Sequence, residues 1–542
     1  MHERQRTAKR RKIQNVVIMK ILLTTLNSKY VHSNLALKYL YTVVADEHSD
    51  VDVREFTINH DPAYIYTELV RANYDMVCFS CYIWNIEQIK ALCSDLKKAK
   101  PNMQICLGGP EVSFDGPKFA VENPWVDLIL CGEGEYSFYR LCQVMTEGGS
   151  LNSIPGLIYR ANGKVFVNGQ MEPMDFNLIP FPYSMVDCKP DQVVYYESVR
   201  GCPFRCTYCL SSIDKDLRCL SVDRVKTDLG YFIYKKVMQV KFIDRTFNYH
   251  IERAYEIFRY LIETDNGITN FHFEICGDLL DKKTLDLLAK ARPGLFQFEI
   301  GIQSTNPKTL AAIHRKENVY PLLYNIEQLI KLRNIHIHVD LIAGLPYETY
   351  EIFKRSFDKV YQLKADAFQL GFLKVLKGTP IFAQVEEHKI LYRNKAPYEV
   401  ISTAYIKAEE LARLHMIENM LDIYYNRGGF SHTLEYFIAV LEKGAFGFYE
   451  MLADFYYETG YQHRNRKKED QYRILRQFAL VLEAQEKERE EQASDTALRK
   501  ENAGLQGLTQ EIESLLCIDI AETFQAEECK RFHKKGWEIS HE

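Results

Sequence analysis

The chain has 542 residues, of which 46% are hydrophobic and 26% charged, and its formal net charge at pH 7 is −5. This length is too great for one ordinary core, so two to four domains are expected. The charge excludes the strongly basic character that usually marks a nucleic-acid-binding protein. No apolar run approaches the roughly 18 residues of a membrane helix, so we expect a cytoplasmic protein without a membrane partner.

The first twelve residues are basic and precede the apolar stretch Val16–Leu26, a pattern that invites a signal-peptide interpretation. Lys20 interrupts that stretch, however, and no small-residue cleavage site follows. We therefore expect residues 1–18 to be a disordered basic arm, with Met19 as a candidate for the true start.

Short apolar runs alternate with helical patterns between residues 19 and 148. The strands expected there are Ile18–Thr25, Val51–Thr57, Asp75–Ser80, Met103–Leu107 and Val126–Cys131. Such alternation predicts a doubly wound α/β fold with a parallel, Rossmann-like sheet. Ligands of these folds bind beyond the carboxyl ends of the strands, so the loops there matter most.

Three of those loops are unusual in composition. Ser80 to Asn85 follows the third strand and includes Tyr82, Gly108-Gly109 follows the fourth, and Gly132-Glu133-Gly134-Glu135 follows the fifth. Glycine allows the backbone to approach a large ligand closely. Because most isolated Gly-Gly pairs are merely tight turns, the prediction of a binding site rests on all three loops lying at one edge.

Residues 149–192 have little periodicity and contain several prolines, so we expect a linker with a small hairpin around Ala161-Asn162-Gly163.

The most informative segment is the run Arg200-Gly201-Cys202-Pro203-Phe204-Arg205-Cys206-Thr207-Tyr208-Cys209. Three neighbouring thiols suit an iron–sulfur cluster, which four cysteines would saturate. The alternative, a structural zinc site, normally requires four ligands in two pairs. No second pair lies near, and Cys219 stands alone, so a cluster with one unfilled iron is favoured.

The Cys-x-x-x-Cys-x-x-Cys spacing, with Tyr208 before the third cysteine, resembles that of the radical S-adenosylmethionine (SAM) enzymes. The resemblance implies a [4Fe-4S] cluster on Cys202, Cys206 and Cys209, with SAM chelated by the free iron. It also implies one-electron cleavage of SAM to a 5'-deoxyadenosyl radical. The electron would come from a donor such as flavodoxin or ferredoxin.

Together with this motif, the three loops resemble the cobalamin-binding domain that precedes one class of radical SAM enzymes. The resemblance implies a corrinoid site at Ser80, Tyr82, Gly108, Gly109, Gly132, Glu133, Gly134 and Glu135. The Asp-x-His-x-x-Gly motif that often supplies a cobalt ligand is absent. His32 is the nearest candidate, but a lone histidine before a helix more often caps or packs, so we expect cobalt without a protein histidine.

Alternation resumes between residues 193 and 382. The strands expected are Val193–Val199, Val240–Asp244, Phe271–Cys276, Phe296–Ile300, Ile335–Ile342 and Ala367–Phe372. Six such repeats predict a partial (β/α)6 barrel of TIM type, whose catalytic groups lie at the carboxyl ends of the strands. The cysteine run follows the first of these strands, where such chemistry belongs.

Other strand ends offer groups to hold SAM. By resemblance, the segments Gly301–Ser304 and Gly344–Pro346 border SAM, which assigns Gln303, Ser304 and Leu345 to the site. Glu274 and Arg315 are further candidates, Arg315 because a guanidinium suits a carboxylate. For Glu274, Arg315 and Asp244 an ordinary salt bridge or cap is about as good an explanation.

Residues 383–476 are expected to form a helical domain rich in aromatic residues, and residues 477–542 a charged helical tail. Aromatic residues at helical spacing usually form core, so a part in a substrate pocket is the secondary hypothesis.

The leading functional hypothesis is a radical SAM enzyme that uses cobalamin, most simply for radical methyl transfer to an unactivated carbon of a small-molecule or peptide substrate. The alternatives are cobalamin-dependent rearrangement or cyclisation, methylthiolation of transfer RNA, and a non-catalytic sensor of cobalamin or redox state. Nucleic acid is not an expected partner, because the tail is helical and the cysteines of the first domain show no cluster arrangement.

Overall fold

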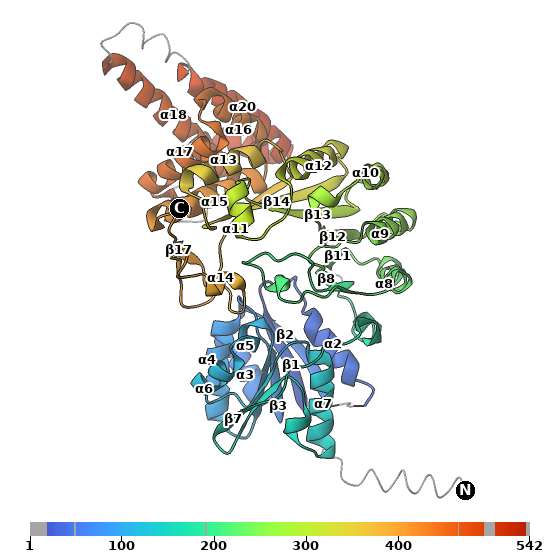
Figure 1. Cartoon of the computed structure of the whole chain (residues 1–542). Coiled ribbons are helices and arrows are strands. Elements are labelled where there is room, and N and C mark those ends of the chain that lie inside the picture. The colour runs from blue at the N-terminus through green and yellow to red at the C-terminus, as the bar shows by residue number, and fades with distance from the viewer. Residues whose placement is uncertain (1–18, 48–49, 190–191, 464–465, 493–504, 538–542) are drawn as a thin grey trace, which may run out of the picture. The chain divides into compact units, whose positions relative to one another are not determined.

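The computed structural model describes residues 19–47, 50–189, 192–463, 466–492 and 505–537 (Figure 1). The predicted arm, residues 1–18, lies outside these ranges. The chain divides into two compact units. The first consists of the described residues of Met1–Glu299, Ile313–His336 and Lys374–Val400, and the second of those of Ile300–Ala312, Ile337–Leu373 and Ile401–Glu542.

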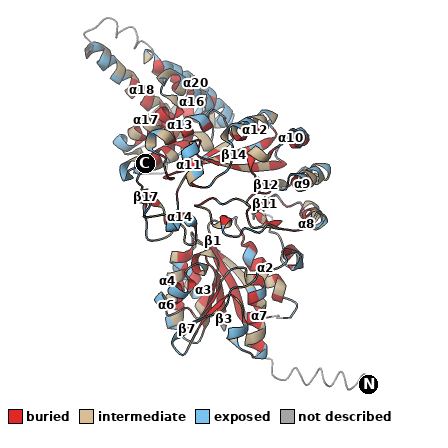
Figure 2. Cartoon of the chain, in the orientation of Figure 1, coloured by how far each residue is buried: buried red, intermediate tan, exposed pale blue. Residues whose placement is uncertain are grey.

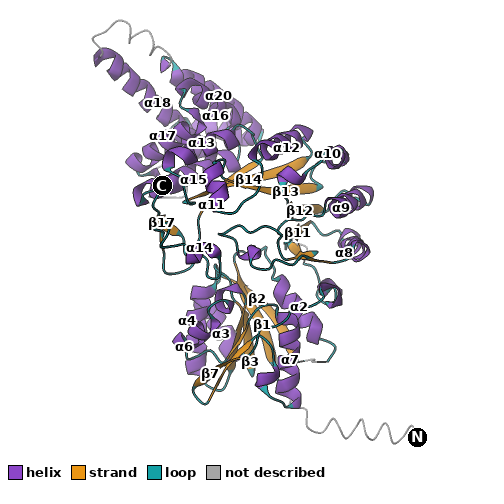
Figure 3. Ribbon diagram, in the orientation of Figure 1, coloured by secondary structure: helices purple, strands orange, loops and turns teal. Residues whose placement is uncertain are grey.

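The first sheet of the first unit has seven strands in the order β2-β1-β3-β4-β5-β6-β7 (Figure 3). Its parallel strands are β1 (Ile21–Asn27), β2 (Val51–Thr57), β3 (Met76–Ser80), β4 (Gln104–Gly108) and β5 (Leu128–Leu130). These confirm the doubly wound parallel sheet that alternation predicted.

Successive β1 side chains point to opposite faces of the sheet. Because apolar side chains lie on both faces, helices cover both. Leu22 and Leu26 pack in the core shared with the helices α3 (Pro62–Arg71), α4 (Ile86–Ala99) and α6 (Gly116–Glu122). Ile21 and Leu23 pack in the core shared with α2 (Leu35–Val44) and α7 (Gly134–Glu147). All seven β1 residues are therefore buried, as the red central strands of Figure 2 show.

The segment predicted as a linker instead extends this sheet. β6 (Leu157–Ala161) pairs antiparallel with β5, and β7 (Lys164–Val167) pairs antiparallel with β6. The predicted hairpin is correct: Asn162 and Gly163 have φ values of +49° and +74°, as a tight two-residue hairpin turn requires. The linker prediction was wrong for these residues because Leu157 and Ile158 are buried against the edge of the sheet.

The second sheet has six strands in the order β15-β14-β13-β12-β11-β8. They are β8 (Val194–Tyr196), β11 (Gln239–Phe242), β12 (Asn270–Glu274), β13 (Phe296–Gln303), β14 (Ile335–Ala343) and β15 (Ala367–Phe372). The helices that follow these strands include α8 (Val222–Tyr234), α9 (Ile251–Glu263), α10 (Lys282–Leu288), α11 (Pro307–Ala312), α12 (Val319–Leu332) and α13 (Tyr350–Tyr361). The six predicted strands are confirmed, and the pairings within each unit are parallel.

The second unit ends in helices, as predicted. They are α15 (Ala408–Leu421), α16 (Ser431–Leu441), α17 (Gly444–Thr459), α18 (Lys468–Gln492), α20 (Leu508–Thr523) and α21 (Ala526–Lys535). Phe437, Phe448 and Phe455 pack with Phe478 of α18, so these aromatic residues form core. None of the helices in the described ranges combines the length and apolar character of a membrane span.

Candidate active site

The cysteine loop begins directly after the short strand β9 (Val199–Arg200), which pairs with β10 (Arg218–Cys219). Gly201 has a φ of +86°, and a Cβ there would lie 2.5 Å from the carbonyl oxygen of Asp216. The Cys202 N–H donates to the Asp214 carbonyl. Glycine is therefore required where the chain turns into the loop.

Asp244, just after β11, binds the backbone that leads into the cysteine loop. Its carboxylate accepts hydrogen bonds from the backbone N–H groups of Ser198 and Val199 at 2.7 and 3.0 Å. Its side chain is fully buried, which raises the pKa of Asp244 to about 6 despite those bonds. The structure thus shows Asp244 as a cap of backbone N–H groups, one of the two explanations that the sequence left open for this residue.

The three predicted cysteines are free thiols of this one loop. Cys202 and Cys206 are buried and Cys209 is half-buried. The Thr207 N–H donates to the Ile313 carbonyl, and its own carbonyl accepts from the Ile381 N–H. Backbone hydrogen bonds therefore anchor the centre of the loop.

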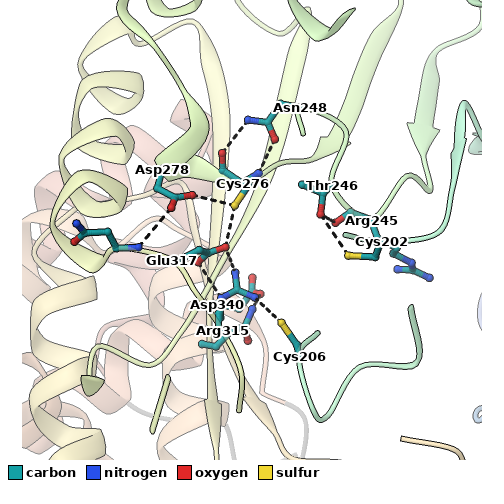
Figure 4. Close-up of polar contacts among 12 residues, drawn as sticks. Cys202, Cys206, Arg245, Thr246, Asn248, Cys276, Asp278, Arg315, Glu317 and Asp340 are labelled. Carbon is teal, nitrogen blue, oxygen red and sulfur yellow. Dashed lines mark hydrogen bonds and ion pairs between the residues drawn. The ribbon is translucent and has the colours of Figure 1, made fainter. Parts of the chain in front are cut away.

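The sulfur atoms have polar neighbours on separate elements (Figure 4). Cys202 Sγ lies 3.8 Å from the Thr246 hydroxyl. Arg315 Nη1 lies 4.0 Å from Cys206 Sγ and 3.2 Å from the Tyr208 hydroxyl. Burial raises the pKa values of Cys202 and Cys206, so metal binding must supply the free energy that keeps them as thiolates.

The donor set fits an iron–sulfur cluster. Three free cysteines lie in one anchored loop, where Cys202 and Cys209 are near enough to act electrostatically on Cys206, and thiolates are the ligands of such clusters. Cys219 lies in β10, and Cys276 has its own carboxylate partners, Asp278 and Glu317, both at 3.0 Å. Cys202, Cys206 and Cys209 would hold the cluster, which leaves one iron without a cysteine.

A cavity of about 650 Å³ lies beside this loop in the first unit. The loops of the first sheet contribute His32, Tyr82, Trp84 and Gly132 to Glu135. The second sheet and the cysteine loop contribute Tyr195, Lys241, Arg245, Glu274 and Arg200 to Gly201, among others. Residues from both predicted cofactor modules thus line the same cavity.

One side of the cavity suits a broad, flat ligand. Tyr82 and Trp84 are stacked with ring centroids 4.5 Å apart and planes 4° from parallel. The indole of Trp84 donates to the Leu26 carbonyl, which fixes its orientation. Aromatic faces of this kind, with a glycine loop beside them, fit a corrinoid.

Glu133 and Glu135 line the cavity and also join the modules by ion pairs. Arg200 contacts Glu135 at 2.6 Å and Glu133 at 3.2 Å, and Arg218 also pairs with Glu133. Burial opposes ionisation of Glu133, but the two guanidinium groups outweigh it and lower its pKa. The carboxylates predicted to face the corrinoid therefore also position the start of the cysteine loop.

Ser80, Gly108 and Gly109 do not line this cavity among the described residues. Gly109 has a φ of +104°, and a Cβ there would lie 2.5 Å from the Cys81 carbonyl oxygen. The Cys81 N–H donates to the Gly108 carbonyl. Two neighbouring loops approach each other here, which explains Gly109 without a ligand; a Cβ on Gly108 would make only an ordinary contact, 3.6 Å from the Leu130 carbonyl oxygen.

His32 also lines the cavity, and its Nδ1 lies 2.7 Å from the Tyr195 hydroxyl. Burial, and then the charges of Lys29 and Lys241, lower the pKa of His32, so the imidazole is neutral near pH 7. The absence of a protein histidine on cobalt stays a prediction.

In the second unit, Gln303 ends β13 and Ser304 follows it. Gln303 has a φ of +68° and donates to Asp340 at 3.1 Å. Ser304 donates to Glu348 at 2.5 Å, and Leu345 is fully buried. Gln303 and Ser304 are thus held by residues that flank the Gly344–Pro346 segment, and the SAM contacts of both segments stay a prediction.

Several residues of the site escaped prediction. Arg245 pairs with Glu274 at 3.3 Å, and Glu317 pairs with Arg315 at 2.6 Å. Arg200 directly precedes Gly201, and its position beside the motif is the one signal that could have marked it. Arg245 lies 29 residues before Glu274, so no local pattern marks that pair. Glu317 lies only two residues after Arg315, but nothing in the sequence shows that Arg315 contacts Cys206.

Family models match three segments in succession. A model for the B12 binding domain matches residues 21–141, and one for the radical SAM superfamily matches residues 196–360. The chain is a radical SAM protein with a B12-binding domain. A third model, described as a protein of unknown function (DUF4080), matches residues 386–536 of this radical SAM protein.

Similar proteins agree with this assignment. An uncharacterized methyltransferase of Pyrococcus horikoshii, PH0819, is 26% identical over 410 residues, covering 70% of this chain and 85% of the relative. The cobalamin-dependent radical SAM methyltransferase TokK of Streptomyces tokunonensis is 27% identical over 306 residues, covering 52% of this chain but 44% of TokK. The chain thus spans less than half of TokK.

Among solved structures, the cobalamin-dependent SAM radical enzyme OxsB, with aqua-cobalamin and SAM bound, matches with a TM-score of 0.59 and 14% identity. The match covers 92% of this chain and 84% of OxsB, and it supports the fold. The cofactors of this radical SAM protein are a [4Fe-4S] cluster, SAM and cobalamin, and its cluster requires an electron donor.

Proposed function

We propose that this radical SAM protein is a cobalamin-dependent methyltransferase that acts on an unactivated carbon of its substrate. The observation that carries the proposal is the shared cavity, whose wall includes Trp84 of the B12-binding module and Gly201 beside the first cysteine. A corrinoid and a radical source must work on one substrate, and such a shared space allows it.

When bound, the cofactors supply a transferable methyl group and a carbon-centred radical that abstracts hydrogen. The chain's own residues position them. Tyr82 and Trp84 offer an aromatic face to a flat ring, and Arg200 joins the Gly132–Glu135 loop to the cysteine loop. Lys241, Arg245 and Glu274 also line the cavity, and their charges would orient a polar substrate.

We also propose flavodoxin or ferredoxin as the electron donor and a small molecule or peptide as the substrate. The free state of all fourteen cysteines supports the cytoplasm as the compartment.

The test is anaerobic reconstitution with iron, sulfide and cobalamin, followed by addition of SAM and dithionite. We expect iron–sulfur and corrinoid bands in the visible spectrum, 5'-deoxyadenosine from reductive cleavage, and S-adenosylhomocysteine from methyl donation. Formation of 5'-deoxyadenosine without S-adenosylhomocysteine would instead favour rearrangement or cyclisation. No SAM cleavage at all would favour a sensor.

Cys206→Ala should lose the cluster bands and SAM cleavage, because one ligand is gone, while the corrinoid bands remain. Cys219→Ala is the matched control, since this half-buried cysteine of β10 lies outside the ligand trio, and it should retain the cluster. Loss of the cluster in both variants would contradict the ligand assignment.

A further inference from the structure

A buried set of polar contacts lies behind the second cysteine (Figure 4). Arg315 directs Nη1 toward Cys206 Sγ and the Tyr208 hydroxyl, at 4.0 and 3.2 Å. Its other face is held by Glu317, with Nε to Oε2 at 2.9 Å and Nη2 to Oε1 at 2.6 Å. The Arg315 side chain is 14% exposed and that of Glu317 5%.

Glu317 is itself fixed from behind. The Cys276 thiol lies 3.0 Å from Glu317 Oε1 and 3.0 Å from Asp278 Oδ1. Asn248 holds the Cys276 backbone with two hydrogen bonds of 2.8 Å, one to the carbonyl and one from the N–H. A thiol and two carboxylates within 4.8 Å could suggest a second metal, but a guanidinium already contacts both oxygens of Glu317.

We propose that Glu317 is a positioning residue that sets the reduction potential of the cluster by holding Arg315 against Cys206. Cluster potentials depend on net charge and on hydrogen bonds to the sulfurs. Reduction adds one electron, and therefore one negative charge, to the cluster. A guanidinium fixed beside a ligand sulfur stabilises that added charge and makes the cluster easier to reduce.

The bidentate pair with Glu317 fixes the position of the Arg315 guanidinium. The arginine side chain is long and flexible, and its planar group is well matched to a carboxylate that binds it at two points. With the Nε and Nη2 edge bound to Glu317, Nη1 is the donor directed toward Cys206. A shorter carboxylate at residue 317 would keep the negative charge but draw the guanidinium away from the sulfur.

The test is a redox titration of the cluster-loaded protein with dithionite, followed by electron paramagnetic resonance, without SAM or substrate. Arg315→Met should lower the ratio of reduced to oxidised cluster at a given potential about tenfold, equivalent to about 59 mV for one electron. Glu317→Asp should lower the ratio in the same direction. The double variant should fall no further than Arg315→Met, because both changes remove one contact.

Arg292→Met is the matched control. Arg292 also pairs bidentately with a carboxylate, Asp265, at 2.8 and 3.2 Å. Asp265 precedes β12 and Arg292 precedes β13, so this pair lies at the amino ends of the strands, whereas the cysteine loop lies at the carboxyl ends. Its titration should match that of the parent protein. If Arg315→Met takes up no cluster, the test rests on Glu317→Asp and Arg315→Lys. The lysine variant is informative because it keeps the positive charge but cannot pair bidentately with Glu317.

An unchanged titration in Glu317→Asp would overturn the proposal, because a role through charge alone survives that substitution. A rise in the ratio in Arg315→Met would overturn it as well. The readout needs only the cluster, so failure of methyl transfer and failure of this proposal are distinguishable.

Discussion

Gly201 precedes the first cluster cysteine in a backbone conformation that other residues avoid, with a carbonyl oxygen 2.5 Å from where a Cβ would lie. We expect Gly201→Ala to shift the loop and reduce iron and sulfide per chain to less than half. Gly163→Ala is the control, since its φ is +74° but nothing lies within 4 Å of its Cβ. It should cost only about 1 kcal/mol and leave iron content unchanged; equal losses would contradict the steric argument.

Glu348 is almost fully buried, and burial raises its pKa to about 8 although Ser304 donates to it. The folded state therefore binds this proton more tightly than the unfolded state. Its contribution to stability is complete below about pH 4.5 and is lost as pH rises toward 8. The free energy of unfolding should fall across that interval.

Glu348→Gln should flatten this pH dependence, because the amide cannot ionise. The measurement is the melting temperature between pH 5 and 9 for both proteins. A parent protein that becomes more stable over this interval, with the variant unchanged, would contradict the assignment.

The contact between the Gly132–Glu135 loop and β9 is the element-scale feature with the clearest energetic consequence. Arg200 and Glu135 are 9% and 7% exposed, so loss of the guanidinium leaves buried carboxylates unpaired. Breaking such a pair costs about 3–5 kcal/mol. Arg200→Met should therefore lower the melting temperature by several degrees and weaken binding of hydroxocobalamin.

Arg54→Met provides the comparison for that variant. Arg54 also pairs with a glutamate, Glu68, but its side chain is 39% exposed, and exposed pairs contribute about 0–1 kcal/mol. Similar destabilisation by both substitutions would show that burial is not the cause.

Strands and their order of appearance could be predicted because buried parallel strands are continuous apolar runs, as in β1 and β3. The hairpin of β6 and β7 was assigned to a linker because its pairing with β5, itself a predicted strand, is visible only in three dimensions. The cysteine trio is local in sequence, so its spacing was sufficient. The contact of Arg315 with Cys206 joins residues 109 positions apart, so it depends on the fold and no local periodicity encodes it.

In the first unit, two cofactor modules share one cavity, and Trp84 is the tryptophan in its wall. A bound corrinoid absorbs near the emission of tryptophan and should quench it. Addition of hydroxocobalamin should therefore reduce the fluorescence of the apoprotein. Trp84→Phe should lose most of that quenching while retaining an aromatic face, and quenching that persists in full would place the corrinoid elsewhere.

The guanidinium of Arg200 pairs with Glu133 and Glu135 of the loop after β5 and with Glu197, only two residues before the first cysteine. Because one side chain joins the loops of both sites, we expect occupation of the corrinoid site to restrain the cysteine loop. The cobalamin-loaded protein should therefore lose cluster iron in air more slowly than protein without cobalamin, and equal rates would contradict this coupling.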